Sequence, residues 1–111
     1  MHVEQNHQQS RSNEKKFWCK VFRTSQDLVG AFCDADLLGK EIKNDKFDVK
    51  VSKHFYGGEK VSERVAVKMM SKITIGNLIG NEIVKVAEDN GFITEENIIL
   101  INDIRHAQFV K

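Results

Sequence analysis

The stretch from Lys53 to Gly91 constrains the fold of this chain more than any other. Near its start, the glycine pair Gly57-Gly58 follows a histidine and two aromatic residues. Adjacent glycines let a backbone take positive φ angles and approach other groups closely. After the pair, Ser62 is a suitable N-cap, and apolar residues recur at helical spacing as far as Asn90-Gly91, a typical helix end. We therefore expect a glycine turn followed by one long helical segment, kinked near Thr74.

Apolar and alternating runs on both sides of this segment predict about five short strands. They span residues 17–23, 28–34, 47–51, 98–101 and 106–110. We expect the first two to form a hairpin centred on Gln26, the fourth to be buried and the last to lie at an edge. Asp34 should cap a short helical turn that Gly39 ends. The predicted fold is α+β: a small, mainly antiparallel sheet with the long helical segment packed on one face.

Composition excludes several classes of protein. The chain has 111 residues and a formal net charge of +1, and no apolar run approaches the ~20 residues that span a bilayer. Two cysteines make neither a disulfide framework nor a structural zinc site, so we expect no metal and no cofactor. The polar start, residues 1–14, predicts a flexible tail before a single domain over residues 15–111. We expect a cytoplasmic protein with no membrane association.

The predicted hairpin would bring aromatic and basic side chains together on strands. Its centre at Gln26 sets Cys19 opposite Cys33 and leaves the aromatic residues on the other face. Rings beside basic residues can form a platform on which nucleic-acid bases stack, although strand aromatics commonly belong to a core. The residues of this platform would be Trp18, Phe22 and Phe32, beside Lys20 and Arg23.

Two further groups of side chains are candidates for binding a partner. One surrounds the glycine pair and consists of Lys53, His54 and Tyr56 with Gly57-Gly58; alternatively, its rings pack beneath the following helix. The second consists of Arg105, His106 and Gln108. His106 and Gln108 share one face of a strand, where neutral hydrogen-bonding groups can read RNA or a protein backbone, or satisfy buried carbonyls.

Five short motifs occur in an order that resembles the archaeal family catalogued as domain of unknown function 424. They are Leu37-Leu38-Gly39-Lys40, Phe55-Tyr56-Gly57-Gly58, Asn77-Leu78-Ile79-Gly80, Glu96-Asn97-Ile98 and His106-Ala107-Gln108. The resemblance runs from about Phe17 to the end of the chain. It implies an archaeal cytoplasmic protein connected with translation, and it adds Asn77 to the candidate binding residues.

Three classes of function remain open. The first is a binding module that contacts RNA or a ribosomal particle through Lys53, His54, Tyr56, Gly57, Gly58, Asn77, Arg105, His106 and Gln108. The second is a small enzyme with His54 or His106 as general base beside the glycine turn. The third is a protein-interaction subunit that uses an exposed edge strand. The sequence assigns no catalytic residue and no metal ligand.

Overall fold

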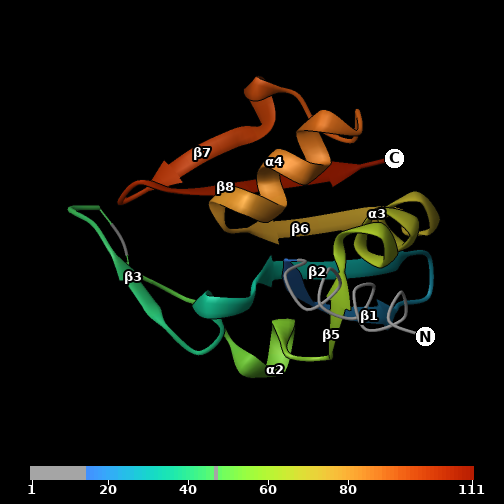
Figure 1. Ribbon diagram of the computed structural model, residues 1–111, viewed down its shortest axis with the longest axis horizontal. Coiled ribbons are helices and arrows are strands. Elements are labelled where there is room, and N and C mark those ends of the chain that lie inside the picture. The colour runs from blue at the N-terminus through green and yellow to red at the C-terminus, as the bar shows by residue number, and fades with distance from the viewer. Residues whose placement is uncertain (1–14, 47) are drawn as a thin grey trace, which may run out of the picture.

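The computed structural model describes residues 15–46 and 48–111 and is organised around a six-stranded mixed sheet (Figure 1). The strands lie in the order β5-β1-β2-β6-β8-β7. β2 and β6 run parallel, and every other neighbouring pair is antiparallel. The strands are β1 (Lys16–Arg23), β2 (Leu28–Asp34), β5 (Glu59–Ser62), β6 (Ile75–Ile79), β7 (Ile98–Ile101) and β8 (Ile104–Val110).

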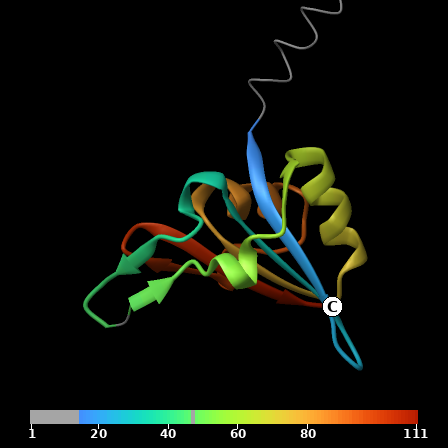
Figure 2. The same ribbon diagram turned by 90° about the horizontal axis from the view of Figure 1, so that it is seen from below.

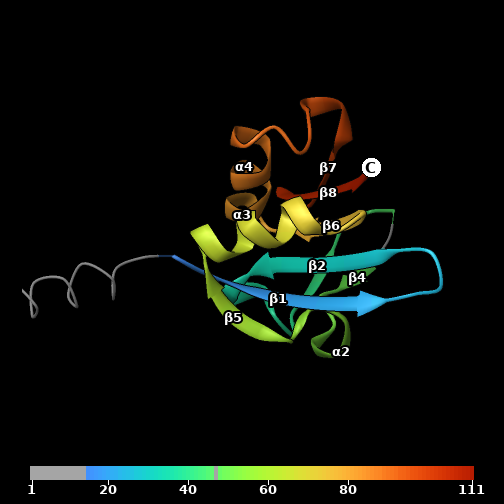
Figure 3. The same ribbon diagram turned by 90° about the vertical axis from the view of Figure 1, so that its right-hand side faces the viewer.

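Short helices cover both faces of this sheet. α3 (Glu63–Lys72) and α4 (Asn81–Asp89) pack side by side on one face (Figures 1 and 3). α2 (Lys53–Tyr56) packs on the other, which we call the α2 face (Figure 2). The hairpin of β3 (Glu41–Lys43) and β4 (Asp48–Lys50) adds to this second layer, as does the 3-10 turn η1 (Ala35–Leu37); a second such turn, η2 (Glu95–Asn97), precedes β7. Each face therefore has its own apolar core.

The predicted fold was wrong, because the long helical segment does not form and the sheet is larger and mixed. The chain leaves α3, crosses the sheet as β6 and only then enters α4. Thr74 fixes the break, since its hydroxyl donates to the Asp27 carboxylate at 3.0 Å and accepts from the Leu28 N–H at 2.9 Å. Gly76 lies under the Phe109 ring, where a Cβ would collide. Ile75, Ile79 and Ile83 have the spacing of one helix but belong to two elements, the first two to β6 and the third to α4.

The predicted hairpin register was also wrong, by one residue. The β1–β2 turn is centred between Ser25 and Gln26, so that Trp18, and not Cys19, lies opposite Cys33. A two-residue loop is favoured because the Thr24 hydroxyl accepts from the Asp27 N–H at 2.9 Å. A shift of one residue moves every side chain of a strand to the other face. The two thiols accordingly lie on opposite faces, and burial raises the pKa of Cys19 to about 11 and that of Cys33 to about 12.

The sheet edges are exchanged relative to the prediction. β8, expected at an edge, lies between β6 and β7. β7, expected to be buried, is an edge strand whose Ile99 and Leu100 are 51% and 60% exposed. β5 forms the other edge and was not predicted, because a two-glycine turn followed by a helix cap left no room for a strand.

Predictions of where helices and turns begin and end were more successful. The Ser62 hydroxyl accepts from the Val65 N–H as the N-cap of α3, and Gly39 and Gly91 take positive φ angles at the predicted turn and helix end. The expected tail over residues 1–14 lies outside the described residues, as does Phe47 of the expected strand 47–51. In the described ranges, no helix is long and apolar enough to cross a bilayer.

Candidate binding surface

Three predicted residues from distant parts of the chain meet on the α2 face. The Tyr56 hydroxyl lies 3.4 Å from Oδ1 of Asn77, and Nε2 of His106 lies 3.2 Å from the same oxygen. Burial raises the pKa of Tyr56, so its hydroxyl stays protonated and donates. Burial lowers the pKa of His106, so its ring is neutral near pH 7. Because Nε2 faces an acceptor, it carries the proton, and Nδ1 keeps its lone pair.

The glycine pair places Tyr56 in this cluster. The Ser52 hydroxyl caps the single turn of α2, and the Gly57 N–H closes it on the Lys53 carbonyl. At Gly58, a Cβ would collide with the carbonyl oxygen of Cys19. Neither glycine of the pair has a positive φ angle. The pair therefore acts by close approach, Gly58 to β1 and Gly57 to the Lys53 carbonyl, and the positive φ angles that were also expected are absent.

Strand pairing places four residues in one line across the α2 face. Lys20 of β1 lies opposite Ala31 of β2, Ala31 is paired with Asn77 of β6, and Asn77 with Gln108 of β8. Directly paired residues point to the same face of a sheet. We call these four residues the cross-sheet row. It begins with a cation and ends with an exposed neutral amide at Gln108.

Lysines and aromatic rings lie together at the β1–β5 end of this face, which we call the basic edge. Nζ of Lys60 lies 5.7 Å from the centre of the Trp18 ring, and Nζ of Lys20 lies 5.2 Å from that of Phe22. Lys20 also donates to the His54 carbonyl at 2.6 Å. Among the described residues, neither lysine forms an ion pair with a carboxylate. Both charges are thus available to an anion.

The base-stacking platform predicted from the sequence is only partly present. Trp18 and Phe22 lie on the α2 face and are half-buried, and the Phe55 ring stacks on Phe22 at 5.4 Å. Phe32, however, is fully buried on the opposite face, as is expected from the corrected register. Arg23 also belongs to that opposite set of β1 side chains.

The other predicted residues contribute unequally. Lys53 and His54 are exposed on α2. The backbone carbonyl of His54 contributes to the surface by accepting from Lys20. Arg105 points to the other face, where it lines a hollow with Glu88 and Glu95. Sequence reasoning missed Lys60. The alternation of Glu59-Lys60-Val61-Ser62 was the available signal, and it required recognising β5 as a strand.

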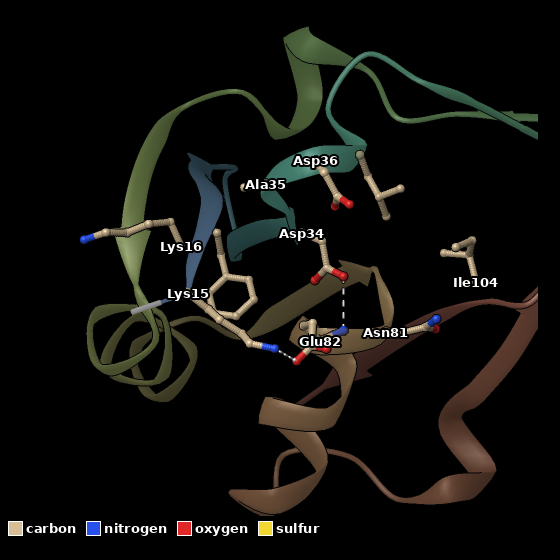
Figure 4. Close-up of a pocket in the computed structure, with 10 residues that line it drawn as sticks. Lys15, Lys16, Asp34, Ala35, Asp36, Asn81, Glu82 and Ile104 are labelled. Carbon is tan, nitrogen blue, oxygen red and sulfur yellow. Dashed lines mark hydrogen bonds and ion pairs between the residues drawn. The ribbon is translucent and has the colours of Figure 1, made fainter. Parts of the chain in front are cut away.

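A separate hollow of about 400 Å³ lies where β2 ends and α4 begins (Figure 4). The Asp34 carboxylate accepts there from the N–H groups of Glu82 at 3.1 Å and Ile83 at 2.8 Å. Asp34 was predicted to cap the short helical turn that follows it. Its side chain makes no such bond and caps α4 instead. Lys15 pairs with Glu82 at 2.8 Å. Because these groups satisfy one another, we assign the hollow a structural role. Within residues 15–46 and 48–111, no group of three or more metal-ligating side chains could hold a metal ion.

Comparison with known proteins identifies the family. Residues 22–111 match the family described as "Protein of unknown function (DUF424)". The chain belongs to this family. A crystal structure of an uncharacterized conserved protein from Methanopyrus kandleri is also similar, with 27% sequence identity and a TM-score of 0.74 over 85% of this chain and 90% of that one. No curated protein matches the chain. The resemblance inferred from the motifs, including its archaeal character, is confirmed.

Proposed function

We propose that this DUF424 protein is a non-enzymatic RNA-binding protein whose binding surface is the α2 face. One observation carries the proposal: the strand register sets two lysines that form no ion pair with a described carboxylate, together with a cluster of neutral hydrogen-bonding groups, on a single face. RNA offers both kinds of complementary group, because its phosphates are anionic and its bases and 2′-hydroxyls form neutral hydrogen bonds.

The two ends of the surface have different roles in this proposal. Lys20 and Lys60 contact phosphates and position the RNA, while a base stacks on the half-buried Trp18 ring. Asn77 and Gln108 bind base edges or 2′-hydroxyls. Tyr56 and His106 hold the Asn77 amide oxygen, so that its NH2 group is the part presented to the ligand. Lys53 and His54, exposed on α2, extend the basic edge.

The test is fluorescence anisotropy with a labelled RNA, comparing the wild type with Lys20→Ala/Lys60→Ala. We expect weaker binding and a salt slope, d log K/d log[salt], that is shallower by about 0.7 for each phosphate that the variant no longer neutralises. The matched control is Lys68→Ala/Lys72→Ala, which removes the same charge from exposed positions of α3. Equal affinities and slopes for the two double variants would refute the proposed surface. Lys60→Ala alone serves if loss of the Lys20–His54 bond unfolds the chain.

We extend the proposal to ribosomal particles in the cytoplasm because the family resemblance suggests a connection with translation. Sedimentation of cell lysate at low and high salt tests this extension. Co-migration with ribosomal particles at low salt, lost at high salt and in the Lys20→Ala/Lys60→Ala variant, would support it. A protein that stays at the top of the gradient at low salt would contradict it.

An enzyme with His106 as general base is the second candidate, favoured by the neutral imidazole that burial and the Asn77 contact produce. This role requires a substrate hollow beside Nδ1, whereas the hollow of about 400 Å³ lies elsewhere and is lined by other residues. A protein partner is a third candidate, through the exposed edge of β7. In either case, the basic-edge variants would leave the activity or the complex unchanged.

A further inference from the structure

We infer that the α2 face selects unpaired RNA, taking a segment of about two or three nucleotides that crosses the strands from the basic edge towards Gln108. This inference rests on the proposed RNA binding and adds to it the form, the length and the direction of the ligand. It follows from the uneven distribution of charge along the cross-sheet row.

Of the described residues, those that β6 and β8 place on their half of the α2 face include no charged side chain. Asn77 and Gln108 are amides, and His106 is neutral near pH 7. Their neighbours on the same face are apolar: Ile75 flanks Asn77 along β6, and Val110 flanks Gln108 along β8. A phosphate placed here would lose its hydration and find no cation, which is energetically costly. This half of the surface therefore suits bases and excludes backbone.

A double helix cannot meet these requirements. It presents phosphates along both strands of its outer surface. Side chains cannot read its deep major groove, and its shallow minor groove displays 2′-hydroxyls and base edges while the Watson–Crick edges are already paired. An unpaired segment turns its phosphates to one side and its bases to the other. The exposed Gln108 amide and the Asn77 NH2 group, which makes no hydrogen bond to any residue of the described ranges, can then reach Watson–Crick edges.

The length of the segment follows from the width of the row. Lys20 and Gln108 are separated by three strand spacings, which is roughly 14 Å at the usual distance between neighbouring strands. Ala31, between them, is fully buried beneath α2, so the segment has to pass over that helix. Four adjacent strands accommodate about two or three bases in a common type of RNA-binding domain, and this sets the length that we assign to the segment. A phosphate at Lys20 fixes one end, and a base at Gln108 fixes the other.

The experiment measures binding of a labelled single-stranded RNA of about 12 nucleotides and of the same RNA annealed to its complement. We expect the single strand to bind at least about tenfold more tightly, because only its bases can reach the neutral half. Gln108→Ala should weaken single-strand binding by about three- to tenfold, the usual effect of removing one hydrogen-bonding group, with no change in the salt slope. The matched control is Gln26→Ala, the same change at the exposed tip of the β1–β2 hairpin.

The outcomes separate this inference from the proposed function. If neither form of RNA binds, the proposed function fails, and this inference fails with it. If the duplex binds as tightly as the single strand, RNA binding stands and the selection for unpaired RNA is overturned. If Gln108→Ala binds like Gln26→Ala, the direction assigned to the segment is wrong. Shortening the RNA gives a further check: affinity should fall sharply only below about three nucleotides.

Discussion

The carboxylate of Asp34 is expected to stabilise α4 although it precedes that helix by more than forty residues. It satisfies two N–H groups of the first turn of α4, that of Glu82 (Figure 4) and that of Ile83. These groups have no partner within the helix. Removing an N-cap side chain costs about 0.5–2 kcal/mol of unfolding free energy. Because one carboxylate serves two donors at 3.1 and 2.8 Å, we expect Asp34→Ala to lose about 1.5–2 kcal/mol, in the upper part of that range.

Thermal unfolding followed by circular dichroism measures this loss. For a domain of this size, 1 kcal/mol corresponds to a shift in Tm of about 4 °C, so Asp34→Ala should melt roughly 6–8 °C below the wild type. Asp36→Ala is the control, because it removes the same charge from an exposed residue two positions further on. Burial raises the pKa of Asp34 more than its two backbone hydrogen bonds lower it. Asp34→Asn, which keeps one acceptor without the charge, should therefore lose less than Asp34→Ala. A Tm for Asp34→Ala equal to that of Asp36→Ala would refute the capping role.

Two further predictions concern the binding surface. Gly58→Ala should lower the free energy of unfolding by about 2–3 kcal/mol, because its Cβ would collide with β1 backbone that cannot move without breaking the β1–β5 pairing. Gly91→Ala, which meets no neighbouring atom and strains only a positive φ angle, should cost less in urea unfolding, and equal losses would contradict this reasoning. For His106, burial lowers the folded-state pKa below the ordinary value of about 6.5, so the unfolded chain binds more protons in that range. The free energy of unfolding should therefore decline as the pH falls below about 6.5, and less steeply in His106→Gln than in the wild type. If the two proteins lose stability in parallel, protonation of His106 is not the cause of the decline.

Features set by neighbouring residues were predicted from the sequence, whereas features set by distant residues were not. The Ser62 cap and the glycine that ends α4 depend on a few adjacent positions, and both predictions hold. The break at Thr74 depends on Asp27 and Leu28, which are more than forty residues away. Without those partners, isoleucines at four-residue spacing fit a helix as well as they fit two elements joined by a glycine.

The candidate site shows the same division. Tyr56 and His106 were selected for their chemistry, but their proximity depends on Asn77 and on the order of the strands. An error of one residue in the β1–β2 register would have placed Lys20 on the face opposite Asn77. The cross-sheet row therefore depends on how the strands pair, and the residue pattern within any one β-strand does not predict it.

The glycine pair nevertheless organises the surface, through the helix that precedes it. α2 has four residues, too few to be stable alone, so its position depends on its contacts with the sheet. Two of these contacts reach different parts of the proposed RNA path: Lys20 donates to the His54 carbonyl, and Tyr56 donates to Asn77. The close approach of Gly58 to β1 fixes the end of the helix between them. One turn of helix thus holds a phosphate-binding lysine and a base-binding amide in fixed relation, which explains why two glycines and two aromatic residues occupy so short a stretch.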